Sequence, residues 1–209
     1  GQMYAFARTL YPICRSITGP GLRETLDLIG ARIPLDRTET PTGTQVLDWT
    51  VPNEWSVREA YIQNAAGERV VDFRNHNLHV LNYSAPFRGQ VALAELKQHI
   101  FTLPDQPTLI PYRTSYYAER WGFCMSHNAL QALPEGDYDV VIDSTLAPGS
   151  LTYAEHVHRG ESEEEVLLQA HICHPSLAND NCSGIALLTQ LAAPLAPLRT
   201  PYTYRFLFA

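Results

Sequence analysis

Two stretches near the N-terminus repeat apolar residues at helical spacing. The first predicts a helix over residues 3–11, which Pro12 ends or kinks. A Gly-Pro-Gly turn at residues 19–21 follows, and the next apolar residues predict a second amphipathic helix over residues 22–29. We therefore expect the chain to open with two helices that each bury one face.

Residues 36–85 change to short runs rich in β-branched and aromatic residues. The runs at residues 58–64 and 69–73 flank Ala-Ala-Gly-Glu, which predicts a β-hairpin. The run "NLHVLNYS", residues 77–84, predicts a further strand, and residues 93–103 predict a short helix. This region is typical of a small, mostly antiparallel β domain.

An irregular stretch rich in proline and aromatic residues, residues 103–123, comes next. Its rings either pack together or line a substrate cleft, since rigid rings give contact area at little entropic cost. The pattern leaves both interpretations open.

The C-terminal part alternates strands with a helix. Segments 137–146 and 149–158 flank a proline-glycine turn, and the apolar run at residues 165–170 predicts a central strand. A helix over residues 183–196 and an aromatic-rich strand over residues 202–209 follow. Strand, helix and strand make a βαβ unit, which predicts an α/β fold with a mainly parallel sheet. Because the chain ends directly after a strand of central type, we expect it to be a fragment.

Composition narrows the function classes. The 209 residues are 45% hydrophobic and 18% charged, as in ordinary soluble proteins. A net charge of −7 argues against a nucleic-acid partner, and no apolar stretch is long enough to cross a membrane. The N-terminus does not resemble a signal peptide, and four cysteines are too few for a disulfide scaffold. We expect a reduced, cytoplasmic protein.

Metal-binding side chains are concentrated in "HICHPSLANDNCSG", residues 171–184, directly after the predicted central strand. In open α/β sheets, ligands bind beyond the carboxyl ends of the strands, where His171 falls. Asp180 comes just before the following helix, and a loop of this length can bring both side chains to one ion. Zinc accepts imidazole and carboxylate ligands, so the segment predicts a metal site.

Other interpretations of these residues stay open at this point. His171 fits a hydrogen-bonded histidine in a strand-end turn, and Asp180 fits a helix cap. His174, which precedes Pro175, either binds metal or shapes the loop. Cys173 and Cys182 fit soft-metal ligands, a pair under oxidation, or buried inert thiols.

Two further kinds of site are disfavoured. Ser176 and Ser183 lack the Gly-x-Ser-x-Gly pattern of a nucleophilic serine. No Cys-x-x-Cys pair is present, which argues against a structural four-ligand zinc site. His156 and His158 alternate along one strand face, a spacing more typical of surface residues.

The segment resembles the co-catalytic zinc aminopeptidase and carboxypeptidase superfamily. There an apolar strand ends in His-x-Asp, and a stretch similar to Asn-Asp-Asn-x-Ser-Gly supplies an aspartate that bridges two zinc ions. More narrowly, the chain resembles bacterial aminopeptidase-like proteins often linked to polysaccharide biosynthesis. The segments that carry this resemblance cover nearly the whole chain: "LYPICRSITGPGLRETL", "GTQVLDWTVPNEW", "NLHVLNYS", "IPYRTSYYAERWGFC", "GSLTYAEH" and "HICHPSLANDNCSG".

The resemblance implies an α/β, aminopeptidase-like three-layer core with a mainly parallel central sheet and a smaller β-rich insertion. We expect residues 1–48 to form the helical start of the core, 49–136 the insertion, and 137–209 the core segment with the metal loop. The resemblance also implies a continuation beyond residue 209 that supplies further ligands and the general base.

The resemblance further implies one or two zinc ions, with His171 as the strand-end ligand and Asp180 as the bridging aspartate. His174 is a candidate extra ligand. Cys173 departs from the pattern, because it stands where the superfamily has an aspartate that orients the histidine.

Two functions follow from the resemblance. The first is a zinc-dependent hydrolase of an amide or peptide bond in polysaccharide or cell-envelope biosynthesis. Its substrate would be a small peptide or an amide-bearing sugar. The alternative is a non-catalytic protein with a degenerate site, which binds a saccharide or a partner through residues 112–123.

Overall fold

A computed structural model describes all residues of the chain, 1–209, as two compact units. Unit 1 comprises residues 1–54 and 148–209, and unit 2 comprises residues 55–147. The chain passes from unit 1 to unit 2 after residue 54 and returns after residue 147, whereas the predicted insertion spans residues 49–136. The strand over residues 137–147, expected in the core segment, lies in unit 2.

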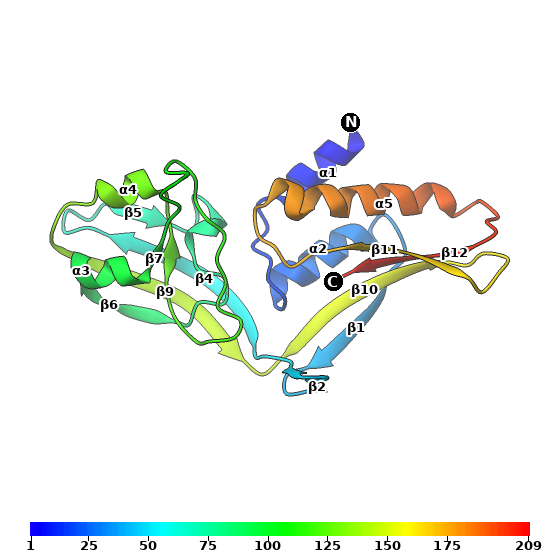
Figure 1. Cartoon of the computed structure of the whole chain (residues 1–209), viewed down its shortest axis with the longest axis horizontal. Helices are drawn as coiled ribbons and strands as arrows, with labels where there is room; N and C mark the ends of the chain where they lie inside the picture. Colours follow the sequence, from blue (N-terminus) through cyan, green and yellow to red (C-terminus); the bar gives the residue numbers. More distant parts are fainter. The chain divides into compact units, whose positions relative to one another are not determined.

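In unit 1, helices lie on one face of a four-stranded sheet (Figure 1). The helices are α1 (Gln2–Leu10), α2 (Pro20–Gly30) and α5 (Ser183–Leu195). The strands, in spatial order, are β1 (Asp36–Pro41), β10 (Ser150–His158), β12 (Thr203–Phe208) and β11 (Glu165–Ala170). A small separate hairpin pairs β2 (Gln45–Val46) with β3 (Trp49–Thr50).

The two predicted N-terminal helices are confirmed. Their apolar positions are buried and join α5 and the sheet in one hydrophobic core, which includes Leu10, Leu26 and Phe206. Gly21 allows the start of α2 to pack closely, because a Cβ atom there would lie 2.1 Å from the carbonyl oxygen of Cys14.

The predicted mainly parallel sheet is wrong for unit 1. Only β11 and β12 are parallel, joined by α5 as the βαβ pattern predicted. β10 pairs antiparallel with both β1 and β12. No helix separates β10 from β11, so β11 returns in the opposite direction, and β12, which is parallel to β11, is therefore antiparallel to β10. β11, expected to be central, lies at the edge of this sheet, where Leu167 is 58% exposed.

Unit 2 is built on a second four-stranded sheet. Its strands, in spatial order, are β5 (Arg69–Asp72), β4 (Glu54–Gln63), β9 (Asp137–Ala147) and β6 (Phe87–Ala92). The short strands β7 (Ile100–Phe101) and β8 (Phe123–Cys124) form a parallel pair. Short helices complete the unit: η1 (Asn77–His79), α3 (Leu93–Leu96), η2 (Lys97–His99) and α4 (His127–Gln131).

The predicted hairpin in unit 2 is confirmed as β4 and β5, which pair antiparallel around a turn with Gly67 at a φ of 81°. The strand predicted over residues 77–84 is wrong. The Nδ1 atom of His76 accepts a hydrogen bond from the backbone of Leu78, which starts the 3₁₀ helix η1 instead. The helix predicted over residues 93–103 is divided among α3, η2 and β7.

Aromatic residues of the irregular stretch pack within unit 2. The Trp121 ring is stacked between Phe87 at 4.0 Å and His99 at 3.6 Å, measured between ring centroids. Both faces of this indole are therefore covered, as the packing interpretation predicts. Tyr117 differs, because it is 85% exposed.

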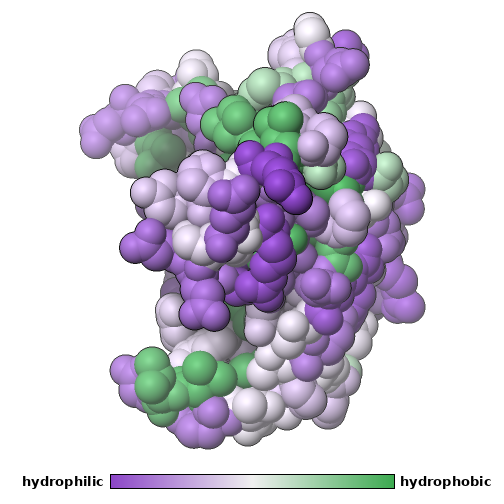
Figure 2. Space-filling model, turned by 90° about the vertical axis from the view of Figure 1, so that its right-hand side faces the viewer, coloured by the Kyte–Doolittle hydropathy of each residue, from purple (hydrophilic) through white to green (hydrophobic).

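Exposed apolar side chains are distributed over several elements, some of them in pairs such as Val46 and Leu47. Leu47 in the β2–β3 hairpin and Leu198 after α5 are 92% and 54% exposed. The face drawn in Figure 2 is mostly hydrophilic, with separate hydrophobic patches. No helix in the chain has both the length and the apolar character needed to cross a bilayer.

Arg23 on α2 binds two carboxylates of unit 1, those of Glu39 in β1 and of Glu54, the last residue of the first segment of this unit. Its guanidinium donates to both carboxylate oxygens of Glu54, at 2.7 and 2.8 Å, and to those of Glu39, at 3.2 and 3.3 Å. Glu54 also accepts a hydrogen bond from the backbone of Ser150 at 3.1 Å. These hydrogen bonds from Arg23 hold the pKa of Glu39 and of Glu54 below their ordinary values.

We expect Arg23→Met to unfold at higher pH than the parent protein. A carboxyl group with a depressed folded pKa stabilises the fold above its unfolded pKa, and this stability is lost as the pH falls through the folded pKa. Without Arg23 the loss begins nearer the unfolded value, and stability at pH 7 falls by about 1 kcal/mol after solvent screening. Acid titration followed by circular dichroism measures the midpoint. Arg159→Met, which removes an exposed arginine in the same unit, is the control; equal midpoints in both variants would contradict the prediction.

Candidate functional site

The segment between β11 and α5, residues 171–182, lies beyond the carboxyl end of β11 and ends in the π-helical turn η3 (Ala178–Cys182). We call it the site loop. The parallel pairing of β11 and β12 continues up to it, because the backbone of Ile172 donates to Ala209 at 2.8 Å and that of Ala209 donates to Ala170 at 3.2 Å. The loop therefore starts from a fixed sheet edge, in the position where α/β folds place ligands.

His174 lies between Asp180, a predicted metal ligand, and Cys173. Its Nε2 atom is 3.3 Å from Oδ2 of Asp180, and its Nδ1 atom is 3.0 Å from Sγ of Cys173. The ring of His171 is 6.0 Å from that of His174, with the two planes 2° apart. The structure thus gathers His171, Cys173, His174 and Asp180 in one place.

The electrostatic environment keeps this imidazole neutral. Burial lowers the pKa of His174 below its ordinary value, although the nearby Asp180 opposes the shift. At neutral pH the contact with Asp180 is therefore a hydrogen bond more than an ion pair. Burial also raises the pKa of the Cys173 thiol. A neutral imidazole beside a carboxylate is a pair of groups that can bind a cation.

The spacing of this pair suits zinc. Two ligand atoms that each lie about 2.0–2.1 Å from a tetrahedral zinc ion are about 3.3 Å apart. The distance from Nε2 of His174 to Oδ2 of Asp180 has this value, 3.3 Å. Across residues 1–209, no three or more histidine, cysteine, aspartate or glutamate side chains are grouped so as to hold a metal ion. The chain therefore presents two well-placed candidate ligands.

Asn181, rather than Asp180, secures the start of α5. Its Oδ1 atom accepts from the backbone of Gly184 at 3.0 Å, and its Nδ2 atom donates to the carbonyl of His171 at 3.3 Å. The interpretation of Asp180 as a mere helix cap is therefore wrong. Gly184 makes this possible, since a Cβ atom there would lie 2.1 Å from the Asn181 oxygen. The peptide bond between Asp180 and Asn181 is cis.

A fully buried arginine that follows α1 in the sequence, Arg15, holds the site loop. Its Nε atom donates to the carbonyl of His174 at 2.9 Å, and Nη2 donates to Sγ of Cys182 at 3.1 Å. Nη1 donates to the carbonyl of Leu10 at the end of α1. The sequence interpretation missed Arg15, although it is the sole charged residue in "LYPICRS" and this isolation was an available signal.

The serine candidates and His156 form hydrogen bonds with backbone carbonyls. The Ser176 hydroxyl donates to the carbonyl of Tyr11, and the Ser183 hydroxyl donates to that of Asn179. Both hydroxyls are therefore engaged in hydrogen bonds to the backbone. His156 contacts the carbonyl of Pro34 through Nδ1. All four cysteines are free thiols, so the disulfide interpretation of Cys173 and Cys182 is not realised here.

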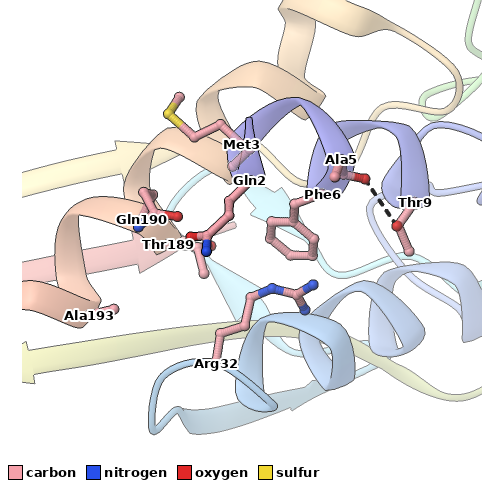
Figure 3. A pocket seen from close by; sticks show the side chains of 10 residues that line it. Gln2, Met3, Ala5, Phe6, Thr9, Arg32, Thr189, Gln190 and Ala193 are labelled. Carbon is pink, nitrogen blue, oxygen red and sulfur yellow. Dashed lines mark hydrogen bonds between the residues drawn. The ribbon is translucent and has the colours of Figure 1, made fainter.

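A cavity of about 440 Å³ lies between α1, α5 and Arg32, and no site-loop residue lines it (Figure 3). The Arg32 guanidinium lies 3.7 Å from the centroid of the Phe6 ring and donates to the carbonyl of Leu28. This cation is thus already engaged by the protein. The cavity and the site loop are separate features of unit 1.

Comparison with known sequences identifies relatives of the whole chain. The sequence profile of a family described as "Domain of unknown function (DUF4910)" matches residues 4–209. A protein of Clostridium acetobutylicum is 52% identical over 209 residues, which are 100% of this chain and 48% of that protein. Its name assigns it provisionally to polysaccharide biosynthesis and gives it an aminopeptidase-like domain. The chain spans about half the length of this curated relative.

Solved structures give the same picture of the fold. A crystal structure from Clostridium acetobutylicum, described provisionally as a peptidase, has a TM-score of 0.97 at 52% identity, over 100% of this chain and 50% of that one. A zinc aminopeptidase from Bacillus subtilis has a TM-score of 0.61 at 12% identity, over 99% of this chain and 59% of its own. At 12% identity the likeness shows the fold alone. The expected resemblance to aminopeptidase-like proteins is confirmed.

Proposed function

The chain belongs to the DUF4910 family and shares the fold of zinc aminopeptidases. We therefore propose that it is part of a zinc-dependent hydrolase of amide or peptide bonds. The observation that carries the proposal is the pair formed by His174 and Asp180 at the carboxyl end of β11. A neutral imidazole and a carboxylate at a tetrahedral ligand spacing form the kind of pair from which catalytic zinc sites are built.

His174 and Asp180 would hold the ion in this proposal. His171, whose ring lies 6.0 Å from that of His174, would be a ligand of a second ion. A bound zinc ion would supply an activated water and polarise the carbonyl oxygen of the amide. The protein's own groups fix the ligands in place. Arg15 holds the carbonyl of His174, and Asn181 holds that of His171.

We propose a small peptide or an amide-bearing sugar as the substrate. The support is the name of the Clostridium acetobutylicum relative, which combines polysaccharide biosynthesis with an aminopeptidase-like domain. Both substrate classes carry the amide carbonyl that a zinc hydrolase of this type attacks.

The test is release of amine from three substrate classes: amino-acid anilides, short peptides and N-acyl sugars. We expect the protein, purified with the continuation that the resemblance implies beyond residue 209, to hydrolyse at least one class with zinc present. This activity should be lost on chelation and in Asp180→Asn. Cys14→Ala, which changes a thiol outside the site loop, serves as the matched control and should retain activity. A protein that binds zinc yet hydrolyses none of the three classes would refute the proposal.

That negative result would favour a second candidate, a saccharide-binding protein. The observation in its favour is a group of tyrosines in unit 2. Tyr112 and Tyr116 contact each other through their hydroxyl oxygens at 2.9 Å, and Tyr117 exposes 85% of its surface. Exposed aromatic rings suit the apolar faces of sugars. Loss of saccharide binding in Tyr117→Ala, with zinc binding intact, would support this candidate.

A further inference from the structure

Cys173 contacts His174 in a way that differs from a metal ligand. The two ring nitrogens of an imidazole lie on different edges of the ring, and in His174 each one faces a different group. Nε2 faces Asp180 at 3.3 Å, whereas Nδ1 faces Sγ of Cys173 at 3.0 Å. Metal-binding histidines generally use one nitrogen for the ion and donate a hydrogen bond from the other, which fixes the ring and its tautomer.

We infer that Cys173 is the positioning residue of His174: its sulfur holds Nδ1 and so aims Nε2 at the ion beside Asp180. This inference rests on the proposed zinc function. It assigns a role to the position that departs from the aminopeptidase pattern. In this chain a thiol does for His174 what a carboxylate does for other metal-binding histidines.

The two restraints on His174 act on different parts of the residue. Arg15 donates from Nε to the backbone carbonyl of His174 at 2.9 Å, which fixes the main chain. That hydrogen bond does not prevent rotation of the imidazole ring about the bond that joins it to Cβ. The contact between Cys173 and Nδ1 restricts this rotation, and the His174 side chain is only 20% exposed. Main chain and ring are therefore held independently.

Direct metal binding by Cys173 does not fit this arrangement. A zinc–sulfur bond is about 2.3 Å long. The sulfur, however, lies against the Nδ1 edge of the ring, away from the Nε2 edge that faces Asp180. A side chain engaged at Nδ1 does not reach an ion held at Nε2. The geometry points to an orienting contact.

Zinc affinity of the purified protein, measured by competition with a chelator, tests the inference. We expect Cys173→Ala to bind zinc about 10–100-fold more weakly than the parent, the range typical for lost orienting partners. Cys173→Asp should restore affinity to within a few-fold, because a carboxylate also accepts from Nδ1. Cys14→Ala should match the parent. An unchanged affinity in Cys173→Ala, or a loss that Cys173→Asp fails to restore, would overturn the inference.

A metal-free measurement separates this inference from the proposed function. Nitrogen-15 NMR of the His174 ring reports which nitrogen carries the proton. We expect Cys173→Ala to change the tautomer balance of His174 in zinc-free protein, whereas Cys14→Ala should leave it unchanged. Identical spectra for Cys173→Ala and the parent would overturn the inference even if zinc binds. A parent protein that binds no zinc would overturn the proposed function, whatever the ring signals show.

Cobalt substitution tests the remaining possibility of direct coordination. A thiolate bound to Co²⁺ produces an intense charge-transfer band in the near ultraviolet. We expect the cobalt-loaded parent to lack this band and Cys173→Ala to change only the weaker visible bands. A charge-transfer band that disappears in Cys173→Ala would make Cys173 a ligand and would overturn the inference.

Discussion

Zinc affinity falls by on the order of 100-fold or more when Asp180 is replaced by alanine, if the proposed site is correct. A carboxylate that binds the ion directly should contribute more than an orienting group, whose loss costs about 10–100-fold. The side chain of Asp180 is 64% exposed, so its removal should change the free energy of unfolding by no more than about 0.5 kcal/mol. Loss of binding without loss of stability is therefore the expected signature.

The measurement is a chelator competition on the parent, Asp180→Ala and His174→Ala, with thermal unfolding recorded for each. Asn179→Ala is the matched control, because Asn179 is exposed and adjoins Asp180 in the same loop. We expect this control to bind zinc as the parent does. An Asp180→Ala variant with parental affinity would show that the 3.3 Å approach to His174 has no part in metal binding.

The second large effect is expected at Arg15, where Arg15→Met should lower the free energy of unfolding by about 3 kcal/mol or more. Methionine fills much of the buried volume but donates no hydrogen bond. The carbonyls of Leu10 and His174 would then lose their partner inside the protein, at about 1–3 kcal/mol each. The stability of Arg15→Lys should lie between that of the parent and that of Arg15→Met, since an ammonium group cannot reproduce the planar guanidinium that reaches three acceptors.

Urea unfolding followed by circular dichroism measures this loss. Arg32→Met is the control, because Arg32 is an exposed arginine of the same unit that contacts the Phe6 ring and one carbonyl. We expect the control to lose no more than about 1 kcal/mol. Equal losses at the two positions would mean that burial of Arg15 contributes nothing beyond an exposed arginine.

Local patterns predicted those parts of the fold that depend on neighbouring residues. The helices α1 and α2 follow from apolar spacing, and the β4–β5 hairpin follows from a glycine turn between two β-rich runs. The strand predicted over residues 77–84 was wrong, because the hydrogen bond that the His76 side chain accepts favours a 3₁₀ turn over a strand. The spacing of apolar residues does not show when a side-chain hydrogen bond will replace the backbone hydrogen bonds of a strand.

The candidate site was predicted in part. A strand followed by a loop and a helix places the loop beyond the strand's carboxyl end, so the sequence located His171, His174 and Asp180 together. It did not show which histidine approaches Asp180, because that depends on how the loop folds between its two ends. It also missed Arg15, which lies far from the loop in sequence and reaches it only through the packing of α1.

The sequence by itself determined the βαβ unit, the site loop and the kind of ligands that the loop carries, because these depend on residues close together in the chain. Only the tertiary structure decided that β10 runs antiparallel to β12 and that β11 lies at the edge of this sheet. It also decided that His174 lies between Cys173 and Asp180 and that a buried arginine holds its carbonyl. Strand order and side-chain approach depend on contacts between distant segments, which local spacing does not encode.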